Sequence, residues 1–289
     1  MWLLYALLSA SSKGVGNALN KVGADKVDSV SLTWIARVIG LVFWIGAYLL
    51  LDNSESSFTV QFAIALAVAG SLTAIASTLR FDAFREGEVS HLIPLGNLLP
   101  VLSAIFAWGL LGEAPGLLGW IGILVVVFGA YMLNLQSSHI KWYEPFYDLY
   151  KAPASQKMLI VVGMLSVSVV FDKVALEDVS VYVWGISILL AQIVVLTPAV
   201  IRKWSSVKKS AVEHYKIITA VAFFSFLAFV LQLLSFEAGG LVGLTLAIKR
   251  LDSLVTISIA GLFMGESNIL SRLKAGAIMA VGAVLVSLS

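Results

Sequence analysis

The chain contains no cysteine, and this absence excludes several kinds of chemistry at once. A protein without thiols has no disulfide, no thiolate nucleophile and no cysteine-ligated metal. Histidine is almost as scarce: only His91, His139 and His214 occur, and no two of them have metal-ligand spacing. We therefore expect neither a metal nor any other cofactor.

Charge of either sign is also scarce. Asp, Glu, Lys and Arg make up 12% of the 289 residues, and the formal net charge is +2. So small an excess of positive charge does not predict a nucleic-acid partner. The chain has no G-x-x-x-x-G-K-[ST] motif, so ATP is not expected to drive it directly. No paired aspartates or nucleophile-base set are visible in its apolar runs, so we do not expect an enzyme.

Apolar residues dominate the composition. They make up 60% of the chain, and the mean hydropathy is +0.96. One soluble core cannot bury so much apolar surface, and the runs are long enough to cross the ~30 Å hydrocarbon layer as helices. The sequence predicts an all-α polytopic membrane protein with ten transmembrane helices, at 2–22, 30–51, 59–83, 89–111, 116–135, 157–176, 181–201, 217–236, 240–263 and 273–288.

The two halves of the chain resemble each other at an offset of about 152 residues. Asn20-Lys21-Val22 falls on Asp172-Lys173-Val174 and, after a slip of one residue, Gly112-Glu113 falls on Gly265-Glu266. Five helices per half would make the second half enter the membrane from the other side, as an inverted repeat. Chance matching among apolar sequences is the alternative. The predicted parts are a five-helix repeat (1–136), a linker rich in Trp, Tyr and Lys that lies at the membrane interface (137–156), and a second five-helix repeat (157–289).

The most informative residues are Lys249, Arg250 and Asp252, which interrupt the apolar run 241–264. Cations at mid-bilayer depth cost several kcal/mol unless a polar cavity or a partner receives them. Lys249 and Asp252 are three residues apart and would share a helix face, whereas Arg250 would point elsewhere and need another partner. The sequence predicts an anion site here, with a purely structural ion pair as the alternative.

Other polar residues in the apolar runs are candidates for the same site. Lys13 and Asn17 share a face of the first run and are predicted to contact substrate. Arg37 is either a cavity residue or a cation that snorkels to the interface. Gln192 and Gln232 are interpreted as hydrogen-bond contacts between helices.

Prolines divide the fourth run. Pro94 and Pro100 flank Asn97, which lies close to the counterpart of Lys249 and Arg250 in the other half. A proline inside a helix frees backbone carbonyls, and such a break can line a cavity. We predict a helix break at Pro94 and Pro100 and a substrate contact from Asn97. Arg80, Asp82 and Glu237 lie near the ends of runs and are predicted to form gate or coupling contacts.

The same segments resemble the EamA-type transporters of the drug/metabolite transporter superfamily. The resemblance is carried by the proline-containing fourth run, Glu86 to Glu113, and by Gly239 to Glu266, each followed by a glycine-rich fifth run. It covers nearly the whole chain and implies ten helices in two halves. Lys249-Arg250 departs from the small and apolar residues usual in that family. This Lys-Arg pair is distantly similar to one in the sugar-phosphate translocators, where such a pair binds the substrate phosphate.

These observations predict a secondary-active transporter that moves a small polar, anionic metabolite by alternating access. The alternatives are an exporter of amphipathic or cationic solutes and a flippase for lipid-linked substrates. The expected partners are the solute, the lipid bilayer and a proton or counter-solute, with the chain acting as a monomer or homodimer. We expect a cell-membrane location, in the inner or plasma membrane of a prokaryote. The positive-inside rule puts both termini outside, whereas the family resemblance puts them inside.

Overall fold

The computed structural model describes residues 1–24, 27, 29–52, 54–87, 89–136, 143–144, 147, 151–264 and 269–289. Helices make up its secondary structure, and these residues contain no strand. The helices are α1 (Trp2–Ala24), α2 (Ser29–Leu51), α3 (Val60–Glu86), α4 (Val89–Gly96), α5 (Leu99–Leu111), α6 (Leu117–Gln136), α8 (Pro153–Ala175), α9 (Val181–Ile201), α10 (Trp204–Glu213), α11 (Tyr215–Glu237), α12 (Val242–Lys249), α13 (Asp252–Met264) and α14 (Ile269–Ser287). Gly265-Glu266 and most of the predicted 137–156 linker lie outside the described residues.

Six segments of the described chain are long and apolar enough to cross a membrane. They are Val30–Leu51, Val60–Glu86, His91–Leu111, Pro153–Ala175, Val181–Ile201 and Tyr215–Glu237. Leu117–Leu133 and Lys274–Ser287 are apolar but shorter. The protein is thus a polytopic helical membrane protein, as predicted. The number ten stays a prediction.

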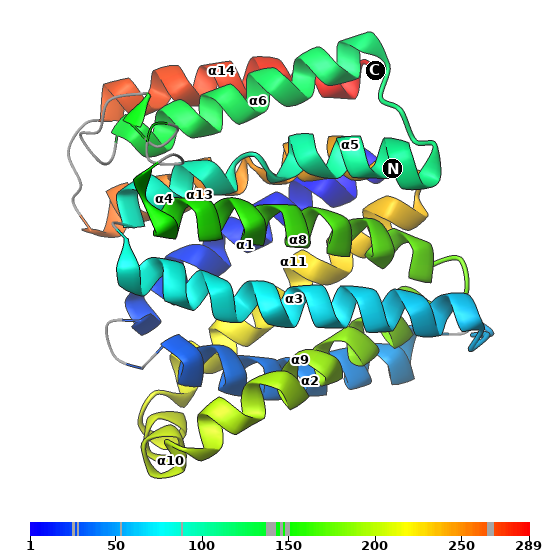
Figure 1. The fold of residues 1–289 in the computed structure, drawn as a ribbon, viewed down its shortest axis with the longest axis vertical. Helices are drawn as coiled ribbons and strands as arrows, with labels where there is room; N and C mark the ends of the chain where they lie inside the picture. Colours follow the sequence, from blue (N-terminus) through cyan, green and yellow to red (C-terminus); the bar gives the residue numbers. More distant parts are fainter. Residues whose placement is uncertain are drawn as a thin grey trace.

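Most long helices lie roughly alongside one another, and both termini are at the same end of the bundle (Figure 1). The most extensive contacts join α3 to α8, α6 to α14 and α1 to α11, followed by α2 with α9. Glycines allow the α6–α14 approach, since a Cβ on Gly122 would lie 2.8 Å from the backbone nitrogen of Val286. The short helix α10 lies at the opposite end from the termini (Figure 1).

Two of the predicted continuous helices are interrupted. The segment predicted at 89–111 consists of α4 and α5, with a turn at Asn97 and Leu98. The segment predicted at 240–263 consists of α12 and α13, with a turn at Arg250 and Leu251. In each case an 8-residue helix precedes a 13-residue helix, and each bound of the second pair is 153 higher than its counterpart in the first.

The first interruption follows from Pro100 in the first turn of α5, which has no N–H to donate to the Gly96 carbonyl, whereas the second contains no proline. In both turns the chain tightens to hydrogen bonds between residues three apart. The amide of Asn97 donates to the carbonyl of Pro94 at 3.1 Å, and the amide of Arg250 donates to that of Ala247 at 3.0 Å. Such turns leave backbone carbonyls without helical partners, which is tolerated at membrane depth where protein or a cavity surrounds them.

Candidate functional site

Three adjoining cavities lie among α1, α2, α8, α9, α11 and α12. The charged cavity, of about 220 Å³, is lined by Lys13, Asp172, Lys249 and Arg250, with Thr73, Ser168, Gln192 and Gln232 among its polar residues. The aromatic cavity, of about 310 Å³, contains Arg37 and Trp44. A third cavity of about 220 Å³ lies along Lys13, Asn17 and Asn20. Phe229 of α11 lines all three, so they adjoin one another.

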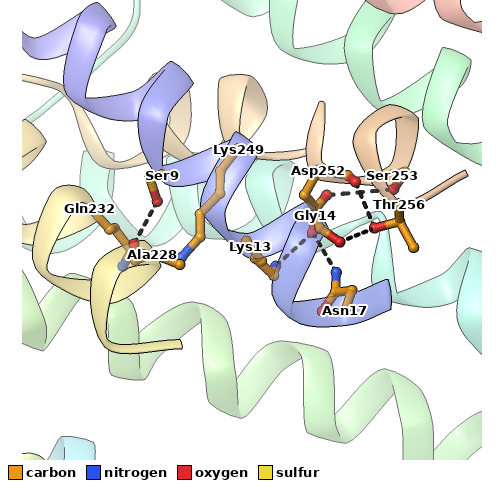
Figure 2. Close-up of polar contacts among 10 residues, drawn as sticks. All are labelled: Ser9, Lys13, Gly14, Asn17, Ala228, Gln232, Lys249, Asp252, Ser253 and Thr256. Carbon is orange, nitrogen blue, oxygen red and sulfur yellow. Dashed lines mark hydrogen bonds and ion pairs between the residues drawn. The ribbon is translucent and has the colours of Figure 1, made fainter. Parts of the chain in front are cut away.

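Lys249 ends α12 and lies at the centre of this region. Its ammonium donates to the side-chain oxygen of Gln232 on α11. The predicted ion pair with Asp252 is replaced by this contact, and Figure 2 shows Lys249 directed away from Asp252 toward Gln232. The reason is the helix break: the i,i+3 geometry holds only in a continuous helix, and the turn at Arg250 separates the two residues.

Asp252 begins α13 and is paired with α1 instead (Figure 2). Its Oδ2 lies 3.2 Å from the Lys13 ammonium and accepts a hydrogen bond of 3.2 Å from the Asn17 amide. The carboxylate is almost completely buried, at 3% exposure. Thr256 extends the junction by donating to the carbonyl of Gly14 at 3.1 Å. One residue of the predicted site therefore joins two helices and neutralises one of the cations.

The arginines are not neutralised in this way. Among the described residues, Arg250, Arg37 and Arg80 have neither a hydrogen bond nor an ion pair with another side chain. Arg250 lines the charged cavity and Arg37 the aromatic cavity. Arg80, on α3, is close enough to Arg37 and to Lys13 to repel both electrostatically. The region thus carries more positive than negative charge, as an anion site requires.

Sequence reasoning missed one carboxylate of this site, Asp172 of α8. It is 5% exposed, lines the charged cavity, and accepts a 3.1 Å hydrogen bond from the indole of Trp184 through Oδ1. The match of Asn20-Lys21 with Asp172-Lys173 pointed to this position, and both Asn20 and Asp172 line cavities. Gln192 and Gln232, interpreted as contacts between helices, also line the charged cavity.

Asn97 is placed differently from the predicted substrate contact. It is buried at 2% exposure in the α4–α5 turn and does not line any of the three cavities. Its amide nitrogen has no hydrogen-bond partner among the described residues. Pro94 and Pro100 are both buried, and they flank the break that they were predicted to cause. The role of Asn97 in binding stays a prediction.

The three predicted gate residues do not lie together. Arg80 and Asp82 are near the end of α3, whereas Glu237 ends α11 at the end of the molecule where the termini lie (Figure 1). Arg80 lies 20 residues after the start of α3, which corresponds to ~30 Å along the helix. Asp82 and Glu237 are exposed. A direct ion pair between Arg80 and Glu237 is thus excluded in this conformation.

Other contacts join the two halves at the end where the termini lie. Lys173 of α8 forms an ion pair with Glu113 and donates to the carbonyl of Gly240 at 3.0 Å. The amide of Ser57 donates to the carbonyl of Asp178 at 2.9 Å. These contacts hold the loops between α2 and α3, α5 and α6, α8 and α9, and α11 and α12 together.

Asp52 lies at the same end of the molecule, directly after α2. Burial by itself would raise the pKa of this carboxyl, but hydrogen bonds from Ser180 and Ser54 outweigh it, so its pKa lies below the ordinary value. A carboxyl with a lowered pKa in the folded state stabilises that state above its unfolded pKa of ~4. The contribution is lost as the pH falls through the lowered pKa.

Comparison with known proteins agrees with this architecture. Residues 1–135 match the EamA-like transporter family. These residues form an EamA-type domain of the drug/metabolite transporter superfamily. The "Uncharacterized transporter in cobO 3'region" of Sinorhizobium sp is 28% identical over 136 residues, which is 46% of this chain and 95% of that protein. That relative is therefore about half as long as this chain.

The fold is also found among solved structures. One crystal structure superposes on this chain with a TM-score of 0.72 at 18% identity, covering 99% of this chain and 96% of the other. The family match and the transporter-named relative both support a membrane transporter rather than an enzyme. Within the described part of the chain, no three His, Asp or Glu side chains lie close enough to hold a metal ion. Chemically, the site can bind and orient a charged solute through ammonium, guanidinium and amide groups.

Proposed function

We propose that this EamA-type protein moves a small, polar anionic metabolite by alternating access around the charged cavity. The observation that carries the proposal is the charge balance of that cavity. Lys249 faces the neutral amide of Gln232, and Asp252 forms its ion pair with Lys13. Arg250 lines the same cavity, and its side chain has no hydrogen bond or ion pair with the described residues. Cations removed from water without a counter-charge are costly, so an anion that enters the cavity is strongly favoured.

The single negative charge of Asp172 does not balance the positive charge of this cavity. Asp172 is the one carboxylate among the described residues that line the charged cavity, against the three cations Lys13, Lys249 and Arg250. Its Oδ1 is already used by the Trp184 indole. A solute with one or two negative charges would bring the cavity close to neutrality.

We further propose that the chain has ten crossing helices in two inverted five-helix repeats. The contacts support this arrangement because they occur in equivalent sets. The packing of α1 on α11 corresponds to that of α8 on α3, and the packing of α1 on α12 and α13 corresponds to that of α8 on α4 and α5. Helices α1 and α8 run in opposite directions (Figure 1), and both interrupted helices break at equivalent positions. Inverted repeats of this kind rock around a central site.

The proposed conformation is closed at the end where the termini lie, because Lys173, Glu113, Ser57 and Asp178 hold the halves together there. The opposite end carries the excess of basic residues, Arg202, Lys203, Lys208, Lys209 and Lys216 among them. By the positive-inside rule we place that end in the cytoplasm of a bacterial cell, with the protein in the cell membrane. A proton or a counter-solute would drive the cycle of a monomer or homodimer.

Ligand-dependent thermal stability tests the proposed function. Purified protein in lipid nanodiscs is heated with phosphorylated, carboxylated, zwitterionic and cationic metabolites, since a ligand that binds the native state raises its apparent stability. We expect stabilisation by anions that is lost in Lys249→Ala/Arg250→Ala. The matched control is Lys208→Ala/Lys216→Ala, which removes the same charge from exposed positions outside the cavities.

Two results would contradict the proposal. Stabilisation by cations or apolar amines that the double variant does not change would favour an exporter of amphipathic or cationic solutes. Stabilisation by lipid-linked anions alone would favour a flippase. Uptake of the stabilising anion into vesicles then separates a carrier from a protein that only binds.

A further inference from the structure

We infer that the aromatic cavity holds a second anion subsite centred on Arg37, so the substrate is an elongated dianion with an acidic group at each end. This inference rests on the proposed anion transport and narrows its substrate class. It begins from an unexplained charge. Arg37 is half-buried on α2 and, among the described residues, has no hydrogen bond or ion pair.

The surroundings of Arg37 provide polar groups but no counter-charge. Among the described residues that line the aromatic cavity, Arg37 is the charged one, and Asn20, Gln192 and Ser225 are neutral. The charged neighbour that acts on it most directly is another cation, Arg80. Two neighbouring arginines with no carboxylate beside them in the described part of the chain are unfavourable inside a membrane protein unless an anion compensates them. A guanidinium is suited to a carboxylate or phosphate, which it can bind through two parallel hydrogen bonds.

The aromatic and charged cavities are adjacent, which makes a single ligand feasible. Ile188 and Gln192 of α9 and Phe229 of α11 line both of them. The Gln192 amide supplies a donor and an acceptor at this shared wall, and the Phe229 ring supplies an apolar surface. One acidic group at Lys249 and Arg250, a short middle along Gln192 and Phe229, and a second acidic group at Arg37 would occupy both cavities.

Matched pairs of ligands test the second subsite. Each α,ω-dicarboxylate from malonate to pimelate is compared with its monomethyl ester, which has nearly the same shape and one charge less. Binding to the wild-type protein in nanodiscs is measured by thermal shift and titration calorimetry. We expect the dianion to bind at least about tenfold more tightly than its ester, which is ~1.4 kcal/mol, with an optimum at one chain length. Long-range attraction alone would favour dianions at every length equally, so a flat series overturns the inference without any variant.

Substitution of Arg37 provides the second arm. In Arg37→Gln the ratio of dianion affinity to ester affinity should fall to about one, while the ester binds as in wild type. In Arg37→Lys the dianion should keep part of its higher affinity. Arg202→Gln is the control, because it removes the same charge from an exposed residue that lines none of the three cavities. An unchanged ratio in Arg37→Gln overturns the second subsite alone. Failure of every mono- and dianion to bind wild type overturns the proposed function as well.

Discussion

Replacing Asp252 with Asn should lower stability and raise anion affinity in the same variant. The carboxylate is 3% exposed and receives Lys13 and Asn17 at 3.2 Å each. Breaking a buried ion pair from one side costs ~3–5 kcal/mol, because the other charge is left without compensation. Lys13 is 33% exposed, so solvent in the cavity screens part of that loss, and we expect about 2 kcal/mol.

The increase in affinity follows from the same contact. Without the negative charge, the Lys13 ammonium becomes a further free cation on the wall of the charged cavity. Thermal unfolding of nanodisc-embedded protein should show a fall of about 4–8 °C, taking ~2–4 °C per kcal/mol for a chain of this size. Titration with the stabilising anion should show tighter binding than in wild type.

A companion variant removes the other partner. Lys13→Met should lose similar stability but weaken anion binding, because it removes a cation instead of liberating one. If Asp252→Asn and Lys13→Met change anion affinity in the same direction, the electrostatic account of the pair is wrong. If neither changes the unfolding temperature, the pair does not join α1 to α13 in the membrane.

Three further outcomes follow from single contacts. Asp172→Asn removes the carboxylate of the charged cavity, so anions should bind several-fold more tightly by calorimetry. Gly185→Ala would place a Cβ 2.2 Å from the ring of Trp44, and overpacking of this kind should cost ~1–3 kcal/mol in thermal unfolding. Lys173→Ala removes the ion pair that closes the end where the termini lie. We expect this variant to speed thiol labelling of a cysteine introduced as Thr73→Cys. That cysteine is the single labelling site, because the chain contains no cysteine of its own.

Matched controls separate these effects from general disruption. Trp184→Phe removes the hydrogen bond to Asp172 and keeps its charge, so it should not raise affinity as Asp172→Asn does. Gly163→Ala, on α8, meets no atom within 4 Å and should be nearly neutral. Lys209→Ala removes an exposed i,i+4 pair and should leave labelling unchanged. Equal effects in a variant and its control would contradict the corresponding argument.

The class of the protein could be read from the sequence because bilayer insertion depends on composition and run length. Apolar runs predicted the helices, and the placement of Lys13, Asn17, Lys249 and Arg250 in such runs predicted a polar interior site. The structure lines adjoining cavities with these four residues. A charge at membrane depth needs a polar environment wherever the helices come to lie, so such residues are informative without any knowledge of packing.

The pairing of these charges depended on the tertiary structure. Spacing suggested Lys249 with Asp252, but a break without proline turns Lys249 to Gln232 and leaves Asp252 to Lys13, 239 positions away in the chain. Asp172 and Arg37 became part of the site for the same reason, since each reaches a cavity only when helices from both halves pack around it. Run length and composition act locally and are visible in the sequence. Which charge meets which partner depends on contacts between distant helices, and only the folded bundle decides them.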